Sequence, residues 1–325
     1  MVQAIRIHET GGPEVMKLEQ VDVPAPGLGM VRVANQAIGL NFIDTYHRSG
    51  LYPVPLPSGL GLEAAGVVEA VGEGDCGGLN VGDRVAYCSA GLGAYAEAIN
   101  LPAERLVLIP DGLDFEQAAA AMLKGQTAEY LLQRSFPLQS GDTCLFHAAA
   151  GGVGLIFGQW AKSIGVNAIG TVGSEEKAEL ARANGYQHVI NYSTENVVER
   201  VAEITSGQKL PVVYDGVGKD TFAMSLDCLR PRGLMVSFGN ASGPVPPLDL
   251  QTLSAKGSLY ITRPTLVTYT ASTADLRQSS ADLFARMLAG DITIDINQRY
   301  GLDAVQQAHR DLEGRKTTGS TLILP

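Results

Sequence analysis

One stretch decides the fold: Asp142-Thr-Cys-Leu-Phe-His-Ala-Ala-Ala-Gly-Gly-Val-Gly154. A short β-type run stops at a turn of small residues, and an apolar helical pattern begins at once. Small residues occupy the three glycine places of the G-x-G-x-x-G dinucleotide fingerprint, namely Ala149, Gly151 and Gly154. The second place lets backbone approach a pyrophosphate, and the third lets the helix pack on the strand. The turn therefore predicts a phosphate site on the unsatisfied, positively polarised amides of the helix N-terminus.

The surrounding sequence supplies the other strands and helices of a dinucleotide domain. Strand-like runs follow the turn, with helix-length segments between them. Together with the run before the turn they number six: 143–147, 167–172, 188–191, 212–215, 234–239 and 259–262. Six alternating β and α units predict a doubly wound parallel sheet that binds a dinucleotide. The alternative is a small-residue turn that serves packing alone.

The residue that ends the second strand bears on which dinucleotide binds. NAD enzymes place Asp or Glu there, about 20 residues beyond the glycines, to accept hydrogen bonds from the ribose. This chain has Gly173, which removes both that partner and the repulsion toward a 2′-phosphate. Ser174 and Lys177 follow as phosphate donors, so we expect NADPH. The alternative is a plain capped helix start with acids at its positive end, in which Glu175 could reach a ribose.

Composition fits two domains and argues against an extended nucleic-acid interface. The chain has 325 residues, and 45% of them are apolar, enough for two cores. Its 24 basic and 34 acidic residues give a net charge of −10, which disfavours binding along a phosphate backbone. No apolar run approaches the roughly 18 residues of a membrane span, and the amino terminus alternates like a strand. We expect a cytoplasmic protein with no membrane partner.

The cysteines and histidines predict neither a disulfide framework nor a metal site. The cysteines are too scattered for a C-x-x-C knuckle and are expected to be reduced; they are Cys76, Cys88, Cys144 and Cys228. The five histidines show no H-E-x-x-H or similar ligand spacing. We therefore expect no bound metal.

The segments on either side of the nucleotide region differ from it in character. The chain before it is β-rich, with short runs at 30–34, 64–71 and 84–87 between glycine-containing turns, as in an irregular barrel or sandwich. Asp114 to Gln117 then caps an amphipathic helical pattern that extends to Leu132 and could link two domains. Near the carboxy terminus, a strand-like run at 319–325 is expected to return to the first domain.

Five motifs carry a resemblance to a known family. They are Gly39-Leu-Asn-Phe-Ile-Asp-Thr-Tyr46, Gly50-Leu-Tyr-Pro53, Gly61-Leu-Glu-Ala-Ala-Gly66, His147-Ala-Ala-Ala-Gly-Gly-Val-Gly154 and Ser237-Phe-Gly-Asn240. Over essentially its whole length the chain resembles the medium-chain dehydrogenase/reductase superfamily, and within it the zinc-free quinone oxidoreductases, the zeta-crystallin-like group. The resemblance implies an α/β fold with two domains. These are a Rossmann NADPH-binding domain over 124–266 and a catalytic, GroES-like irregular β-barrel over 1–123 and 267–325.

Two positions separate this chain from the zinc-dependent alcohol dehydrogenases of the same superfamily. Where those enzymes have a Cys and a His, this chain has Asn41 and Leu62, and it lacks their four-cysteine lobe. Without thiolate and imidazole a catalytic zinc cannot be held. An alcohol has no good route to hydride loss without that Lewis acid, whereas a quinone is already a strong electrophile. We therefore expect NADPH-dependent quinone reduction.

The resemblance also implies roles for individual residues near the nicotinamide. In the family, the segment matching Asn41, Phe42, Ile43, Asp44 and Tyr46 faces the nicotinamide. The residue matching Tyr52 lines the substrate cleft. We take Asn41, Asp44, Tyr46 and Tyr52 as catalytic candidates. The alternatives are packing at a domain edge for the two tyrosines and an Asx-type turn for Asn41 and Asp44.

Other cofactor contacts are expected from the rest of the chain. Tyr192 resembles a neighbour of the adenine or the 2′-phosphate, and Arg315 resembles a second phosphate cation, with a solvated surface charge as its alternative. Arg263, a further catalytic candidate, could reach the nicotinamide side of the cleft. Position in the fold adds Thr127, Tyr130, Gly151, Gly152, Val153, Gly173, Val217, Phe238, Gly239 and Asn240.

Two other functions stay open at this point. The same fold and cofactor serve reductases of α,β-unsaturated carbonyls. A third hypothesis is a non-catalytic NADPH-binding protein, crystallin-like or RNA-binding, although the acidic balance counts against RNA. No residue stands out as an obligatory acid or base, so protons could come from Tyr46, Tyr52 or solvent.

The expected last strand of the sheet predicts a homodimer. The run 257–262 is apolar, and an open apolar edge invites pairing with another chain. Two copies related by a twofold axis could join these edges into one sheet, as members of the resembled family commonly do.

Overall fold

The computed structural model describes residues 1–325, which form two compact units. The first unit contains Met1–Gln126, Thr270–Leu288 and Ile294–Pro325, and the second contains Thr127–Tyr269 and Ala289–Thr293. The boundaries expected from sequence did not separate the short segment Ala289–Thr293. It groups with the second unit because Gln159 holds it: the Gln159 Oε1 accepts from the Thr293 N–H at 2.7 Å, and the Gln159 Nε2 donates to the Thr293 carbonyl at 3.0 Å.

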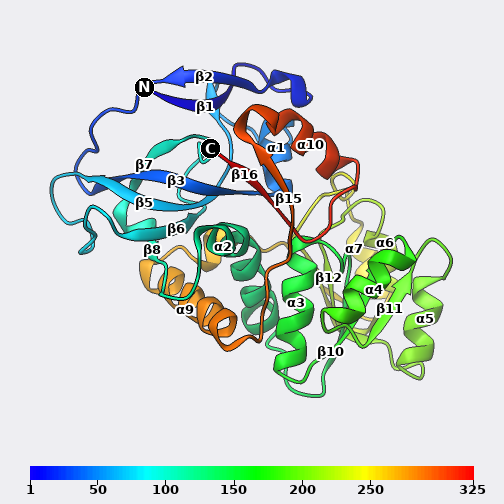
Figure 1. The fold of residues 1–325 in the computed structure, drawn as a ribbon. Coiled ribbons are helices and arrows are strands. Elements are labelled where there is room, and N and C mark those ends of the chain that lie inside the picture. Colours follow the sequence, from blue (N-terminus) through cyan, green and yellow to red (C-terminus); the bar gives the residue numbers. More distant parts are fainter. The chain divides into compact units, whose positions relative to one another are not determined.

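The second unit is built on a six-stranded parallel sheet (Figure 1). The sheet order is β11-β10-β9-β12-β13-β14. The strands are β9 (Thr143–Phe146), β10 (Asn167–Val172), β11 (His188–Asn191), β12 (Leu210–Asp215), β13 (Leu229–Ser237) and β14 (Tyr260–Thr262). The chain steps outward from β9 in both directions, so the crevice at the carboxyl end of β9 is a topological switch point, where doubly wound sheets bind ligands. The expected doubly wound parallel sheet is confirmed.

Five helices connect these strands and cover the sheet. They are α3 (Gly152–Ser163), α4 (Glu175–Ala183), α5 (Val197–Ile204), α6 (Phe222–Asp227) and α7 (Leu250–Ala255). The strands are apolar along most of their length because helices cover parallel sheets on both faces. Leu145, Ile169 and Val213 from the sheet are fully buried and share one core with Val201 and Leu226 from the helices.

Two strand boundaries differ from the prediction. β13 was predicted over 234–239 and runs from Leu229 to Ser237. Pro231 and Gly233 lie within it, and in the sequence these two residues resemble a turn before the strand. β14 begins at Tyr260 and not at 257. Gly257 and Ser258 have φ angles of 108° and 56°, a left-handed pair that a strand cannot contain.

The first unit contains two antiparallel-rich sheets. A three-stranded sheet has the order β2-β1-β4, and a larger one has the order β15-β16-β3-β5-β6-β8, with β7 also paired to β3. The strands are β1 (Val2–Ile7), β2 (Lys17–Val21), β3 (Met30–Leu40), β4 (Ser58–Gly59), β5 (Glu63–Val71), β6 (Arg84–Cys88), β7 (Ala98–Pro102), β8 (Val107–Leu108), β15 (Ile296–Gly301) and β16 (Ser320–Leu324). β16 pairs antiparallel with β3, which confirms that the carboxy-terminal run returns to the first unit.

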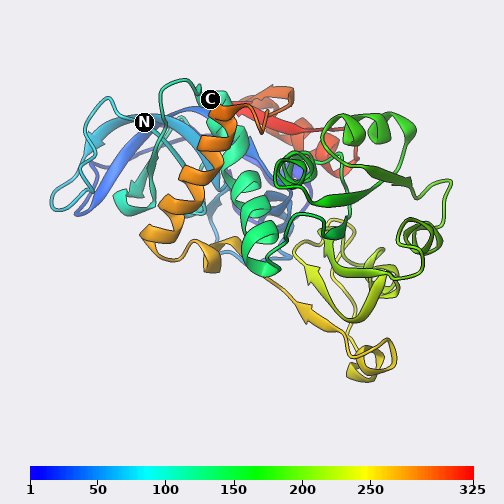
Figure 2. The same cartoon turned by 90° about the horizontal axis from the view of Figure 1, so that it is seen from below.

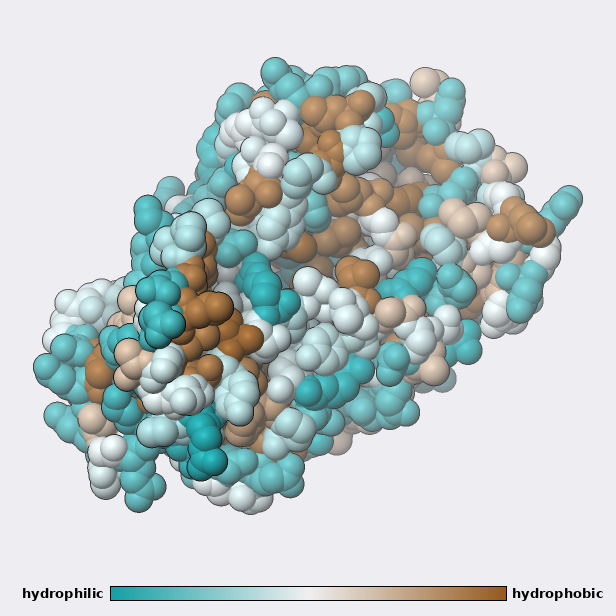
Figure 3. Space-filling view, turned by 180° about the vertical axis from the view of Figure 1, so that it is seen from behind, coloured by the Kyte–Doolittle hydropathy of each residue, from teal (hydrophilic) through white to brown (hydrophobic).

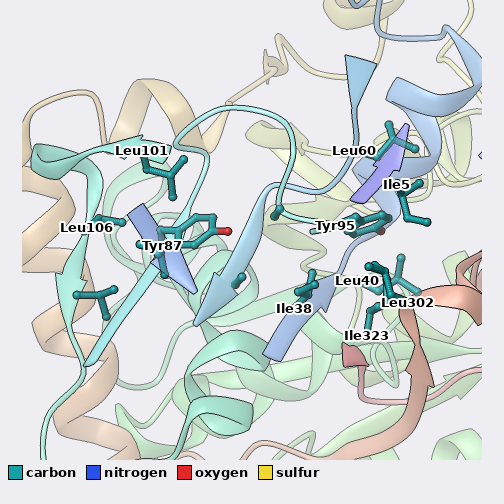
Figure 4. Packing of buried hydrophobic residues seen from close by; sticks show 14 of the residues in the cluster. Ile5, Ile38, Leu40, Leu60, Tyr87, Tyr95, Leu101, Leu106, Leu302 and Ile323 are labelled. Atoms are coloured by element: carbon teal, nitrogen blue, oxygen red, sulfur yellow. The ribbon is translucent and has the colours of Figure 1, made fainter. Parts of the chain in front are cut away.

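Apolar side chains from these strands meet in one core (Figure 4). Ile38 and Leu40 on β3 are buried beside Tyr95, and Ile5 on β1 and Leu60 lie on the other side of the tyrosine ring. The core therefore holds a phenol in a fixed position within an apolar environment.

A long helix, α2 (Phe115–Tyr130), runs from the first unit into the second. Its predicted cap is confirmed: the Asp114 Oδ1 accepts from the Gln117 N–H, and the Gln117 Oε1 accepts from the Asp114 N–H. The prediction of an amphipathic helix was wrong, because residues 118–122 are all buried. In the first unit, α9 (Thr273–Ala289) runs beside α2 (Figure 2), and a Cβ on Gly125 would lie 2.4 Å from Leu283.

No helix has both the length and the apolar composition that a membrane crossing needs. On the face drawn in Figure 3, apolar residues gather in separate patches among hydrophilic ones.

Candidate nucleotide and substrate sites

The turn from β9 into α3 presents backbone amides as the fingerprint predicts. Ala148 adopts a left-handed conformation, with a φ of 59°, and turns the chain so that Gly151 becomes the N-cap of α3. Gly151 supplies no capping side chain. Gly151, Gly152 and Val153 are partly exposed. The first amides of this helix, with the positive end of its dipole, therefore fit a pyrophosphate.

Neighbouring glycines give this turn its shape. A Cβ on Gly154 would lie 2.5 Å from the carbonyl oxygens of Ala148 and Ala149, so a side chain there would push α3 away from the turn. Ala149 takes the first glycine place without conflict because its methyl group faces Gly170 on β10. A Cβ on Gly170 would come within 2.6 Å of that methyl group. The departure from the fingerprint is thus compensated on the adjacent strand.

The ends of β10 and β11 bring Gly173 and Tyr192 together. A Cβ on Gly173 would lie 2.6 Å from the Tyr192 hydroxyl oxygen, and the Ser193 hydroxyl donates to the Gly173 carbonyl at 2.9 Å. Ser174 is the N-cap of α4 and accepts from the Lys177 N–H at 3.3 Å. The cap that was the alternative explanation of Ser174 is therefore present, and the Ser174 O–H can still donate. These residues fit a phosphorylated ribose, since no carboxylate ends β10.

The loops after β12 and β13 pack against each other. The Ser242 N–H donates to the Val217 carbonyl at 2.8 Å, and a Cβ on Gly239 would lie 2.3 Å from the Gly216 carbonyl oxygen. The predicted cofactor residues Val217, Phe238, Gly239 and Asn240 all belong to this loop pair and are partly exposed. Backbone contacts therefore hold the two loops together at the carboxyl ends of β12 and β13.

Arg263 follows β14 and ties these loops to the sheet. Its Nη1 donates to the Ser237 carbonyl at 2.8 Å and to the Gly239 carbonyl at 3.1 Å. The contacts give this predicted catalytic candidate an evident role in holding the loop.

A buried network lies beneath the nucleotide turn. The His147 Nδ1 lies 2.9 Å from the Thr171 hydroxyl oxygen, and its Nε2 lies 2.9 Å from the Ser225 hydroxyl oxygen. The Ser225 hydroxyl in turn donates to Asp215, which also accepts from the Val217 N–H. Burial lowers the pKa of His147, against the raising effect of the Asp215 charge. Asp215 was not among the predicted site residues, although it ends β12 and anchors the loop that follows.

Thr127 and Tyr130 lie on the part of α2 that belongs to the second unit, and both are buried. The Tyr130 ring stacks on Tyr269, with centroids 4.5 Å apart, and the Arg134 guanidinium lies over the Tyr269 ring. Burial raises the pKa of the Tyr130 hydroxyl. Tyr130 is therefore a neutral, rigid phenol.

In the first unit, Asn41 begins α1 (Phe42–Ser49) and its side chain faces a buried ion pair. The Asn41 Nδ2 donates to the Glu63 Oε2 at 2.7 Å, and the Lys124 Nζ lies 3.3 Å from the same oxygen. The Leu123 N–H donates to the Glu63 Oε1 at 2.6 Å. An amide, an ammonium and one carboxylate do not form a zinc ligand set. No group of three or more His, Cys, Asp and Glu side chains in the chain is arranged to hold a metal ion.

Aromatic side chains gather on and after α1. The ring centroids of Phe42 and Tyr46 are 5.7 Å apart, and those of Tyr46 and Tyr52 are 5.1 Å apart with an edge-to-face arrangement. The Tyr52 N–H donates to the Tyr46 carbonyl. Tyr46 is buried, whereas Phe42, Ile43 and Tyr52 are partly exposed. This arrangement provides apolar ring surface with two hydroxyl groups, which suits a flat carbonyl compound.

Asp44, also on α1, is fully buried. Its Oδ2 accepts from the Asn41 N–H at 2.9 Å and from the Tyr95 hydroxyl at 2.8 Å. Burial raises the pKa of Asp44 to about 7, against the lowering effect of those two hydrogen bonds. In place of the Asx-type turn that was the alternative for these residues, Asn41 and Asp44 form the capping box of α1, in which the Asp44 carboxylate accepts from the Asn41 N–H.

Arg315 belongs to the first unit, in the exposed turn after α10 (Val305–Glu313). Its φ of 58° is left-handed, and its N–H donates to the Leu312 carbonyl at 3.1 Å. Ser174, Lys177 and Tyr192 belong to the second unit.

Four residues near Asn41 and Asp44 received no role from sequence analysis: Glu63, Tyr95, Lys124 and His309. Each is far from α1 in the sequence, and isolated acids, bases and tyrosines without a ligand spacing carry no local indication that they will meet. Only Glu63, two residues after the glycine of the Gly61 motif, lay within a quoted motif.

Comparisons with known proteins agree over the whole chain. A family model described as zinc-binding dehydrogenase matches residues 152–285, and one described as alcohol dehydrogenase GroES-like domain matches residues 27–111. A quinone oxidoreductase of Pseudomonas aeruginosa is 57% identical over 326 residues, and a 2-haloacrylate reductase of a Burkholderia species is 46% identical over 333 residues. The matches cover all of this chain, all of the first relative and 99% of the second. The crystal structure of Escherichia coli quinone oxidoreductase complexed with NADPH is 50% identical, with a TM-score of 0.98, covering 99% of this chain and 100% of that one.

Proposed function

Because this chain belongs to the quinone oxidoreductases of the medium-chain dehydrogenase/reductase superfamily, we propose that it transfers reducing equivalents from NADPH to quinones without a metal ion. The observation that carries the proposal is the pairing of Asn41 with Glu63 and Lys124. Asn41 and Leu62 stand where the zinc enzymes of the superfamily use Cys and His. The side chains of Asn41, Glu63 and Lys124 form a hydrogen-bonded group around a buried ion pair, and they offer no thiolate or imidazole to a Lewis acid.

The nucleotide would be held largely by backbone. We assign the pyrophosphate to the amides of Gly151, Gly152 and Val153, for which the uncapped start of α3 is the support. The 2′-phosphate is assigned to Ser174 and Lys177 beside Gly173, with Tyr192 at the adenine end and Arg315 as a further cation. We assign the nicotinamide end to residues of α2 and of the loops after β12 and β13, namely Thr127, Tyr130, Val217, Phe238, Gly239 and Asn240. Arg263 is assigned to the same end as the residue that holds the loop after β13. When bound, NADPH supplies the hydride.

The substrate would be held by the aromatic group on α1. Tyr46 and Tyr52 offer ring edges and hydroxyl groups to a planar quinone, and Asn41, Phe42, Ile43 and Asp44 form the adjoining wall. A quinone accepts hydride readily once it is positioned, so most of the catalysis would come from orientation. The four buried, free cysteines support a reducing compartment such as the cytoplasm.

A second candidate function is reduction of an α,β-unsaturated carbonyl compound. The observation that favours it is the 46% identity to a 2-haloacrylate reductase over the whole chain. An enone is also an electrophile that needs only a positioned hydride and a proton.

The experiment is an assay of NADPH oxidation against a para-quinone, an enone and a primary alcohol, before and after dialysis against a strong chelator. We expect turnover with the quinone that exceeds turnover with the enone, none with the alcohol, and no loss on chelation. Enone turnover above quinone turnover would favour the second candidate. Bound RNA at physiological ionic strength would support the non-catalytic hypothesis instead.

A homodimer is proposed on the strength of β14. This strand ends the sheet order, and Tyr260 on it is 61% exposed. Joining two such edges would shield the open strand. Light scattering should give twice 34.2 kDa. Tyr260→Glu should halve that mass, whereas Tyr192→Glu, an exposed tyrosine on another loop, should not.

A further inference from the structure

A buried carboxylate stands at the carboxyl end of β12. Asp215 is the last residue of this strand, and it is fully buried. Its Oδ1 accepts from the Val217 N–H at 2.8 Å and from the Gly218 N–H at 2.9 Å. Backbone N–H groups only donate hydrogen bonds, so both amides need an acceptor in that place. The loop after β12, residues 216–221, is therefore folded around one carboxylate oxygen.

The loop after β13 holds the same segment from its other side. The Val217 carbonyl accepts from the Ser242 N–H at 2.8 Å and from the Ser242 hydroxyl at 2.9 Å. Gly218 has a left-handed φ of 92°, and a Cβ there would lie 2.6 Å from the Gly243 carbonyl oxygen. The Val217 side chain is partly exposed. Its position is set by these backbone contacts, with Asp215 on one side and Ser242 on the other.

Hydroxyl groups and a histidine hold the carboxylate itself. The Thr221 hydroxyl donates to the carboxylate and lies 2.8 and 2.7 Å from its two oxygens. The Ser225 hydroxyl lies 2.9 Å from the Asp215 Oδ2 and 2.8 Å from the Thr221 carbonyl oxygen. Both of those atoms are acceptors, so the His147 Nε2, 2.9 Å from the Ser225 oxygen, must donate to it. His147 directly follows β9, which ties the carboxylate to the neighbouring strand.

The surroundings of Asp215 require an acceptor and not only a side chain that fills space. Four donors converge on it, namely the two loop amides and the two hydroxyls. Buried donors without an acceptor are costly. If the carboxylate were removed, we expect the loop to leave its present conformation, so that its amides find other partners.

From these contacts we propose that Asp215 is a positioning residue for the nicotinamide, which acts by holding the loop after β12 in the conformation that receives the ring. This inference rests on the proposed function, which assigns Val217 to the nicotinamide end of NADPH. The pyrophosphate is assigned to other amides, those at the start of α3. Loss of Asp215 should therefore affect one end of the nucleotide more than the other.

The test compares two ligands that differ at the nicotinamide end. They are NADPH and 2′-phospho-ADP-ribose, which keeps the pyrophosphate and the 2′-phosphate and has no nicotinamide. Calorimetry gives the dissociation constant of each for the full chain. In Asp215→Ala the loop amides lose their acceptor, whereas Asp215→Asn keeps one oxygen that can face them. Ser225→Ala leaves the loop amides paired and removes one of the hydroxyls that hold the carboxylate.

The matched control lies at the other end of the same strand. The Thr205 hydroxyl donates to the Val201 carbonyl at 2.7 Å and accepts from the Lys209 N–H at 3.0 Å, just before β12 begins. Thr205→Ala thus removes a hydroxyl that also organises backbone in the second unit, and it should change neither dissociation constant.

We expect Asp215→Ala to raise the dissociation constant of NADPH about tenfold, because the constant rises as the fraction of protein with a competent loop falls. The constant of 2′-phospho-ADP-ribose should change by less than about twofold. Asp215→Asn should recover most of the NADPH affinity, and Ser225→Ala should weaken NADPH alone, by about threefold.

Equal weakening of both ligands in Asp215→Ala, or unchanged binding of NADPH, would overturn the inference. If Asp215→Ala does not fold, Ser225→Ala decides in the same way, and a wild-type ratio of the two constants would overturn the inference. Quinone turnover of the wild-type protein is measured separately. Its absence would reject the proposed function, while the ratio of the two constants would still decide the role of Asp215.

Discussion

The two units arrange their candidate functional groups by different means. In the second unit the groups are backbone amides at Gly151, Gly152 and Val153, and the places left open by missing side chains at Gly154 and Gly173. In the first unit they are side chains brought together from distant strands and helices, such as Arg48 and His309, 261 residues apart. A backbone site should fail when atoms are added. A side-chain site should fail when one partner is removed.

The largest effect should come from breaking the buried ion pair of the first unit. Lys124→Met leaves the Glu63 carboxylate buried without its cation. We expect the free energy of unfolding to fall by about 3 to 5 kcal/mol, the usual cost of an uncompensated buried charge. Urea unfolding followed by circular dichroism measures the change.

The matched controls isolate the charge. Lys124→Met combined with Glu63→Gln should recover most of the loss, since neither partner is then charged. Lys316→Ala removes an exposed lysine 3.6 Å from Asp311 and should leave stability unchanged. Equal stability of the single and double variants would mean that the carboxylate is not what makes Lys124 necessary.

The next effect should come from adding one methyl group to the nucleotide turn. In Gly154→Ala the new Cβ meets two carbonyl oxygens at 2.5 Å, and we expect a loss of about 1 to 3 kcal/mol in stability from overpacking. The displaced start of α3 should also weaken NADPH binding, measured by calorimetry. Gly27→Ala, where a Cβ meets nothing within 4 Å, is the control and should change neither. Wild-type affinity in Gly154→Ala would show that the amides of α3 are not the phosphate site.

The smallest effect concerns Lys177, a side-chain charge assigned to the nucleotide site of the second unit. Lys177→Ala should reduce the preference for NADPH over NADH by about tenfold, the value of one charge-assisted contact to the 2′-phosphate. Lys162→Ala removes an exposed lysine in the last turn of α3, at the far end of that helix from its N-terminal amides, and should leave the preference unchanged. Dissociation constants for both nucleotides check this. Equal weakening of NADPH and NADH in Lys177→Ala would rule out phosphate recognition by this lysine.

The same contrast explains what the sequence could predict. The nucleotide unit follows from local spacing, because glycines, strand runs and helix starts are each encoded within a few neighbouring residues. The doubly wound parallel sheet and the α3 turn were therefore predictable, and even Ala149 in a glycine place did not obscure them. The boundaries of β13 and β14 were harder to predict. Left-handed residues such as Arg232 and Ser258 depend on contacts that a local pattern does not contain.

The first unit was predictable in class but not in its chemistry. β16 returning to β3 followed from a strand-like run, but the burial of α2 on all sides depends on what packs around it. Likewise, nothing next to Glu63 or Tyr95 in the sequence shows that they meet Lys124 or His309. The raised pKa of Asp44 follows from those meetings and from burial, so it too was beyond a local analysis.

We propose a metal-independent reduction of quinones by NADPH. The most direct measurement is a single-turnover experiment in which chelator-dialysed protein, preloaded with NADPH, is mixed with a para-quinone. We expect one NADPH to be oxidised for each quinone reduced, at the rate of untreated protein. A rate that disappears on chelation and returns with zinc, or NADPH that stays reduced in the presence of quinone, would contradict it.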